Sequence, residues 1–215
     1  MSRSFFLKAT VLMAAWILLL GVLSIRGFFA NFSALPPRLV LALLPPLVLV
    51  LIFSRSHAGK AFLQYVQPQW LIYLQSFRIL VEIGLWLLVR NGSLPVNMSF
   101  EGRNFDVLTG LLAVPIGYYC FVKKAWPPVV AMLYNIAGLV LLTNIVTIST
   151  LSMPTALRVF HNTPDSSLLT RFPFIYLPGL LVPLAYTLHI FSLRQWGMFR
   201  RSARQKDITI TLTGR

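Results

Sequence analysis

The sequence predicts an all-α fold, a polytopic bundle of about six transmembrane helices, from its composition, its apolar runs and its cation placement. Hydrophobic residues make up 57% of the 215 residues, charged residues only 11%, and the mean hydropathy is +0.74. Soluble domains carry about 25% charged residues, so this chain has too little polar surface to face water on all sides. Apolar runs near the 20 or so residues that cross a bilayer recur along the chain.

These runs predict one membrane domain, residues 1–199, followed by a basic cytoplasmic tail, residues 200–215, which we expect to be poorly ordered. The six predicted spans are residues 8–29, 38–53, 69–89, 105–122, 129–150 and 172–193. The first has a longer apolar run than a usual signal peptide and no clean A-x-A site after it, so we expect a retained helix. Pro45-Pro46 predicts a kink in the second.

Lysine and arginine counts predict the orientation of the bundle. With the N-terminus inside, twelve of the 19 basic residues fall on the inner side and six on the outer side, while Arg78 lies within a span. Cytoplasmic loops of membrane proteins are enriched in Lys and Arg. The bias therefore favours both termini on the cytoplasmic side, and the short loops favour antiparallel neighbours.

The third span contains a polar stripe. Gln75, Arg78, Glu82 and Trp86 are spaced by three, four and four residues, which places them within about 80° on one helix face. A charge at the bilayer centre costs about 3 kcal/mol, so this face should point into the bundle. Arg78 and Glu82, at i and i+4, can pair directly. Both a polar pocket and a buried structural ion pair fit the stripe, and the sequence leaves the choice open.

A second polar cluster precedes and begins the fourth span. The chain has only five acidic residues, and Glu101, Asp106 and Asp165 fall in the predicted outer half. Helix N-termini favour negative charge, which explains part of this placement. We still expect a shared polar site that includes Arg78 and Arg103. The predicted ligand-binding residues are Gln75, Arg78, Glu82, Arg103 and Asp106.

Secondary candidates for that site are more scattered: Glu101, Asn144, His161 and His189. We interpret His189 as a structural histidine, and the three histidines are too far apart in the predicted topology to form a metal site. Asn135 and Asn144, nine residues apart, point in opposite directions, and at least one should make an interhelical hydrogen bond.

The fourth span also has Gly110, Ala113 and Gly117 on one face. Small residues let transmembrane helices approach closely, so this face is expected to pack against a neighbouring helix. Cys120, the single cysteine, cannot form an internal disulfide and is interpreted as a small structural residue.

Missing motifs make an enzyme a weak expectation. The sequence has no H-E-x-x-H, G-x-S-x-G or Walker A pattern and no lysine in the core of a predicted helix, so no catalytic residue, cofactor or metal is predicted. The net charge of +14 lies mainly beside apolar segments, which favours contact with anionic lipid over nucleic acid.

Three short stretches carry a resemblance: 100–106 (FEGRNFD), 172–179 (FPFIYLPG) and 188–195 (LHIFSLRQ). They resemble segments of an uncharacterised family of small bacterial polytopic inner-membrane proteins, over most of the third to sixth spans. The resemblance implies a bacterial cytoplasmic membrane and brings no activity, substrate or cofactor.

The leading functional expectation is binding or translocation of a small molecule or ion through an outward-facing polar cavity, where Arg78 and Arg103 attract a polar or anionic ligand. A non-catalytic scaffold subunit with a membrane-protein partner is one alternative. A lipid-modifying enzyme that uses Glu82, Asp106 or His161 is the other. Under each of them the exterior of the bundle contacts membrane lipids.

Overall fold

The computed structural model describes the backbone of residues 3–213 and the side chains of that range except 202–204 and 206–213. Within this range it contains helices and no strand, which confirms the predicted all-α class. The α-helices are α1 (Arg3–Ile25), α2 (Val40–Arg55), α3 (His57–Tyr65), α4 (Pro68–Tyr73), α5 (Phe77–Arg90), α6 (Val107–Gly117), α7 (Pro128–Leu151) and α8 (Val182–Thr213). A 3₁₀ turn, Leu74–Ser76, joins α4 to α5, and π-helical turns extend α6 (Tyr118–Val122) and precede α8 (Leu177–Leu181).

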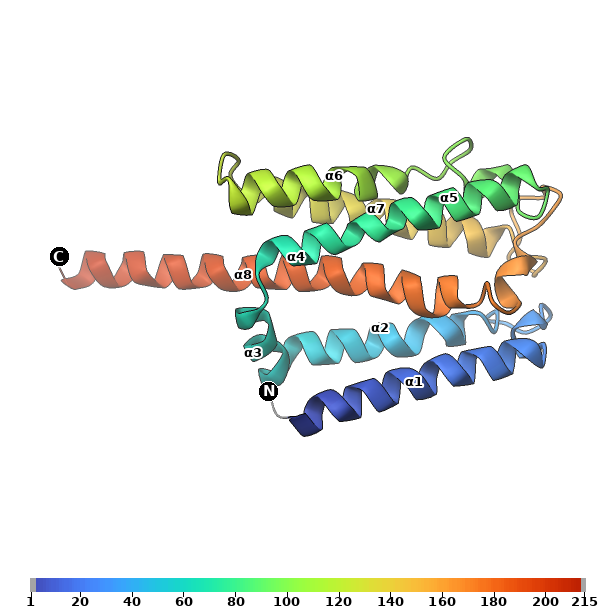
Figure 1. Ribbon diagram of the computed structural model, residues 1–215, viewed down its shortest axis with the longest axis horizontal. Coiled ribbons are helices and arrows are strands. Elements are labelled where there is room, and N and C mark those ends of the chain that lie inside the picture. The colour runs from blue at the N-terminus through green and yellow to red at the C-terminus, as the bar shows by residue number, and fades with distance from the viewer. Residues whose placement is uncertain (1–2, 214–215) are drawn as a thin grey trace.

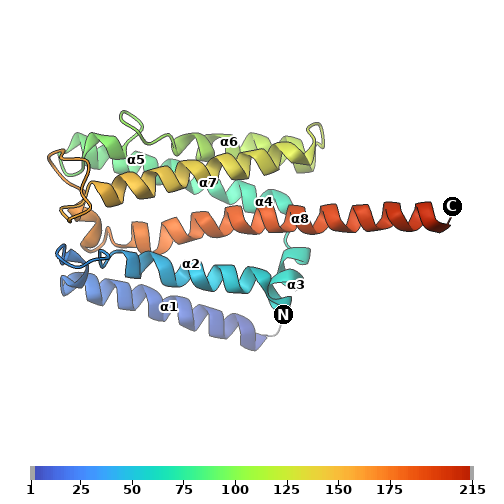
Figure 2. The ribbon, with the colours of Figure 1, turned by 180° about the vertical axis from the view of Figure 1, so that it is seen from behind.

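The long helices lie side by side in one bundle (Figures 1 and 2). Helix α8 lies between the α1–α2 pair and the group formed by α4 to α7, and its most extensive packing is against α7 and α2. Helix α1 begins and α8 ends at the same end of the bundle. The longer loops gather at the opposite end, which we call the loop end.

Each predicted span corresponds to a helical segment, but not every segment has the length of a span. Four helical segments are long and apolar enough to cross a membrane: Arg3–Ile25, Pro68–Arg90, Pro128–Leu151 and Leu177–Arg201. Helices α2 and α3 make a fifth only if this pair, bent by 81°, is one span, and Val107–Val122 is shorter. The structure therefore gives four to five candidate spans where the sequence predicted about six.

Apolar side chains cover much of the outside of the bundle. Leu12 is 60% exposed, Leu18 68% and Ile25 70%, all on α1, which has few buried residues. Exposed large apolar side chains recur on the other long helices as well. Such an exterior is stable when hydrocarbon, rather than water, is the solvent.

The small-residue face predicted for the fourth span packs as expected. Gly110 lies so close to α5 that a Cβ there would come within 2.8 Å of the side chain of Ile79. Ala113, one turn further along α6, is fully buried. This contact brings the start of α6 against the first turn of α5.

Ordered turns close the loop end. The hydroxyl of Ser166 donates to the carbonyl of Ser149 at 2.6 Å, and the hydroxyl of Ser24 donates to the carbonyl of Thr170 at 2.8 Å. Met153 and Leu169 are buried beneath these turns. The segment that connects α7 to α8 therefore covers the loop end of the bundle.

The backbone of the C-terminal segment is helical. Helix α8 continues without a break to Thr213 and projects beyond the other helices (Figure 1). Once a helix has formed, each added residue contributes one further backbone hydrogen bond, so extension of an existing helix is easier than starting a new one. The poor order expected for residues 200–215 stays a prediction.

Candidate functional site

The side chain of Arg78 is the centre of a buried polar network. It projects from α5, is 2% exposed, and forms a two-pronged ion pair with Asp106 at the start of α6. Its Nε lies 2.7 Å from Oδ2 of Asp106, and its Nη2 contacts Oδ1. A fork of parallel N–H donors facing one carboxylate is the strongest geometry available to such a pair.

This pairing corrects the expectation that Arg78 and Glu82 pair along the helix. Among the described residues the ion pairs are Arg78–Asp106 and Arg90–Glu101. Because α6 approaches α5 at Gly110, the carboxylate of Asp106 meets the edge of the guanidinium that carries Nε and Nη2.

The guanidinium also fixes the protonation of His189 on α8. Arginine can only donate, so the contact of 2.9 Å between Nη1 of Arg78 and Nε2 of His189 makes Nε2 an acceptor. The proton of this neutral ring therefore lies on Nδ1, which donates to Oδ1 of Asn135 at 2.9 Å. The amide of Asn135 donates in turn to the carbonyl of Ala131 and the hydroxyl of Ser192.

A glycine on α7 makes room for that histidine. A Cβ on Gly138 would overlap the imidazole of His189, which is fully buried. Asn135 lies on the same helix and confirms the expected interhelical hydrogen bond. The network thus ties α6, α5, α8 and α7 together through Asp106, Arg78, His189 and Asn135.

Glu82 lies one turn beyond Arg78 on α5, and only one of its two carboxylate oxygens has a hydrogen-bond partner among the described residues. Its Oε1 accepts from the amide of Asn104 at 2.6 Å, and that amide also donates to the carbonyl of Met98 at 3.1 Å. Its Oε2 is buried and has no hydrogen-bond partner among the described residues. Since Asp106 balances Arg78 and His189 is neutral, Glu82 is the unbalanced ionisable group of the cluster.

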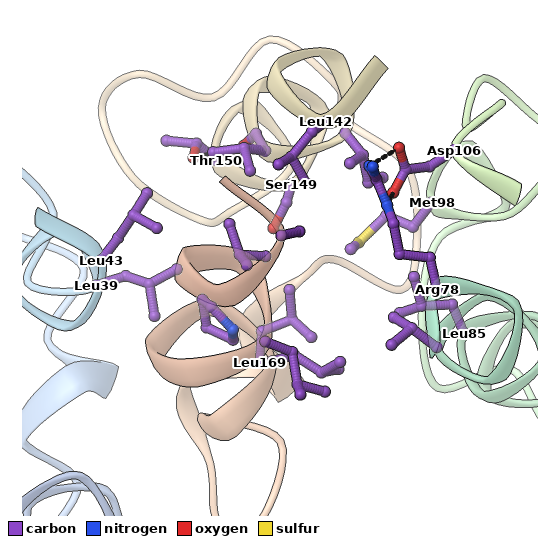
Figure 3. Close-up of a pocket in the computed structure, with 18 of the residues that line it drawn as sticks. Leu39, Leu43, Arg78, Leu85, Met98, Asp106, Leu142, Ser149, Thr150 and Leu169 are labelled. Atoms are coloured by element: carbon purple, nitrogen blue, oxygen red, sulfur yellow. Dashed lines mark hydrogen bonds and ion pairs between the residues drawn. The ribbon is translucent and has the colours of Figure 1, made fainter. Parts of the chain in front are cut away.

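A cavity of about 90 Å³ adjoins this network. It lies between α2, α5, α7 and the start of α8, toward the loop end (Figure 3). Five polar side chains line it: Arg78, Glu82, Asp106, Ser149 and Thr150. Leu43 on α2 and Leu39, the residue before this helix, lie across the cavity from Arg78, and the remaining lining is apolar. The sequence predicted a polar cavity, whereas the structure shows an apolar one with polar groups along part of its wall.

Two of the five predicted ligand-binding residues do not line the cavity. Gln75 is fully buried, and its amide donates to the carbonyl of Ala185 at 3.2 Å, which fastens the α4–α5 junction to α8. Arg103 is exposed, and its guanidinium lies 5.3 Å from the ring centre of Phe160. The expected shared site of Arg78 and Arg103 is therefore wrong, because the turn before α6 directs Asp106 inward and leaves Arg103 outside.

The secondary candidates separate in the same way. Glu101 accepts from the indole of Trp86 at 2.9 Å and pairs with Arg90 at 3.2 Å on the surface. Asn144 is exposed and donates to the backbone carbonyl of Arg103, and His161 is exposed in the α7–α8 connection. His189 alone of the four joins the buried network, through Arg78, although the cavity lining does not include it.

Asn104 and Ser192 are site residues that the sequence reasoning missed. Asn104 holds Glu82, and its Oδ1 accepts from the backbone N–H of Asp106 at 3.1 Å. The position of Asn104, two residues before Asp106, was the feature of the sequence that could have indicated its role. Ser192 gave none, since a lone serine in an apolar helix is common.

No group of three or more His, Cys, Asp or Glu residues within the described part of the chain could hold a metal ion. The enzyme alternative requires a carboxylate and a histidine within hydrogen-bond reach. Both ring nitrogens of His189 are engaged by Arg78 and Asn135, and His161 lies outside the cavity. Of the described residues, neither His189 nor His161 therefore pairs with Glu82 or Asp106 in the cavity.

The long apolar helices and the buried ionisable cluster are those of a helical integral membrane protein, and its cavity is mainly apolar with polar groups along part of the wall. Comparisons with protein-family models, with curated proteins and with solved structures found no match.

Proposed function

We propose that this chain is a six-span protein of the bacterial cytoplasmic membrane that binds a small molecule in the cavity and translocates it. The observation that carries the proposal is the buried, unpartnered Oε2 of Glu82, on a side chain that lines the cavity. Both termini are cytoplasmic in this proposal, so the cavity lies in the outer half of the membrane.

The chemistry of the cavity supports a binding site. Ligand pockets are lined mainly by apolar side chains, with a few polar groups that orient the ligand. A buried polar atom without a partner costs about 1–3 kcal/mol. Gln75, Thr109 and Ser152 also have such an atom among the described residues, but only Glu82 has it on a side chain that lines the cavity. Arg78 and Asp106 satisfy each other, whereas Glu82 keeps one oxygen for a further partner.

The ligand expected from the sequence changes accordingly. From the sequence, Arg78 and Arg103 together are expected to attract a polar or anionic ligand. Because Asp106 already occupies the fork of Arg78, the group that remains to be satisfied is an acceptor. The site therefore favours a ligand that donates a hydrogen bond.

A cavity-filling substitution tests this proposal. Val146 on α7 lines the cavity, and Val140 on the same helix is 63% exposed on the outside. The protein, purified in membrane discs that keep native lipids, is weighed by native mass spectrometry. We expect a bound small molecule that Val146→Phe loses and Val140→Phe, the matched control, retains.

If wild-type protein carries no molecule, or if both variants retain it equally, the binding proposal is wrong. A stoichiometric protein partner in the same preparation, without a bound small molecule, would support the scaffold alternative instead.

A further inference from the structure

A second depression lies on the outside of the bundle, between α5 and the segment that leads into α8. It has a volume of about 490 Å³ and an apolar lining that includes Leu80, Gly84 and Phe174. Leu80 is 74% exposed, so this lateral groove faces the surroundings of the bundle at the depth of the spans.

The lateral groove and the cavity share a wall. Four apolar side chains line both of them: Val81, Leu85, Leu177 and Leu181. Glu82 follows Val81 in the chain and lines the cavity side. One layer of apolar side chains therefore separates the lipid-facing groove from the carboxylate. Leu177 and Leu181 belong to the π-helical turn before α8, a local irregularity of the kind often found at functional sites.

We propose that the cavity binds an amphiphile with a cationic amine head, which enters sideways from the lipid. Its ammonium group donates to Oε2 of Glu82, and its apolar chain crosses the shared wall into the lateral groove. This inference rests on the proposed binding function and adds the ligand class and the route.

The net charge of the buried cluster favours a ligand with an amine head group. With Asp106 paired to Arg78 and His189 neutral, an ionised Glu82 gives the cluster a net charge of −1. A net charge inside a membrane bundle is costly unless an opposite charge accompanies it. An ammonium group supplies both the positive charge and N–H donors, whereas a carboxylate head would add a second negative charge beside Glu82.

The apolar lining of the cavity and of the lateral groove favours a ligand with an apolar chain. Apart from its five polar side chains the cavity has an apolar lining, and the groove is lined entirely by carbon side chains and Gly84. A small hydrated cation would leave these apolar walls in contact with water. An alkyl chain would bury apolar surface against them, with a gain in free energy of about 25 cal/mol per Å².

Chain-matched probes test the ligand class. The affinities of dodecylamine, dodecanol and laurate are measured for the full-length protein in membrane discs, with empty discs subtracted. Dodecylamine should bind wild-type protein most tightly. Glu82→Gln should weaken its binding about tenfold or more, the loss expected for one hydrogen bond to a charged group. Glu101→Gln, at a surface carboxylate, should leave it unchanged.

Neighbouring residues on α5 test the route. A Cβ on Gly84 would meet no atom within 4 Å, and Gly84 lines the lateral groove, so Gly84→Phe should narrow the groove. Ile83 is 46% exposed and is not part of the groove lining. Gly84→Phe should weaken dodecylamine binding, and Ile83→Phe should not.

Equal binding of laurate or dodecanol by wild-type protein would overturn the inference, as would full amine binding by Glu82→Gln or by Gly84→Phe. The wild-type probe series decides the head group even if Glu82→Gln fails to fold. If Val146→Phe loses a native molecule but the probes show no amine preference, the ligand class is wrong and the binding function stands. If no native molecule is found, the binding function itself fails.

Discussion

At the residue scale, the partner of Arg78 determines how the site is interpreted. A buried ion pair is weak evidence for stability, because desolvation offsets much of the attraction. Removing one member is different, since it leaves the other charged and unpaired in the bundle. Arg78 and Asp106 are 2% and 5% exposed, so neither could recover solvation from water.

Leucine substitutions at this pair give a stability prediction. Arg78→Leu and Asp106→Leu should each lower the free energy of unfolding by about 3–5 kcal/mol, because each leaves an uncompensated buried charge. The double variant should be clearly more stable than the sum of the two losses implies. Denaturant unfolding of the purified protein in mixed micelles measures all three.

Glu101→Leu is the matched control for that series. Its pair with Arg90 is on the surface, and such exposed pairs contribute about 0–1 kcal/mol. Strictly additive losses in the Arg78 and Asp106 variants would show that the two side chains do not act as a pair.

At the scale of single helices, close contact between α5 and α6 positions the site. Gly110 lets the backbone of α6 approach α5, and this approach places Asp106 against Arg78. The small-residue spacing was visible in the sequence, and the packing face was predicted correctly. Which helix it contacts could not be predicted, because spacing defines a face and not its neighbour.

Glycine substitutions distinguish that contact from helix propensity. Gly110→Leu should separate α5 from α6, lower thermal stability and expose the buried pair. Gly84→Leu on α5 meets open space, so it should keep or slightly raise stability, since leucine favours helix more than glycine. Thermal unfolding in detergent measures both, and equal effects of the two substitutions would contradict a specific role for the Gly110 contact.

At the scale of the whole molecule, the two ends of the bundle have different constructions. The short helix α3 bends away from α2 by 81° at the end where α1 begins, and its start is capped by the hydroxyl of Ser56, which accepts from the N–H of Gly59 at 3.0 Å. The opposite end, the loop end, is covered by the turns between α7 and α8. The proposed topology places these ends on opposite sides of the membrane.

Cysteine labelling tests that topology, since Cys120 is the single native cysteine and is buried. In a Cys120→Ser background, His161→Cys at the loop end should react with a membrane-impermeant maleimide on intact spheroplasts. Lys60→Cys on α3 should react only after lysis. Labelling of both sites before lysis would rule out the proposed topology, and the reverse pattern would invert it.

The sequence by itself determined the all-α class, the helical segments and the inward orientation of the charged face of α5. The fifth predicted span, residues 129–150, differs from α7, Pro128–Leu151, by one residue at each end. These features follow from local costs, because an apolar run or a charge in a membrane helix is favourable or unfavourable wherever its partners lie.

Only the tertiary structure decided which groups meet. Arg78 pairs with a carboxylate 28 positions away and contacts a histidine 111 positions away, and neither distance is encoded in a helical period. The same packing left Arg103 outside and made the cavity mainly apolar. Contacts between helices depend on which faces interlock across the whole bundle, and that choice is cooperative, so no single segment contains it.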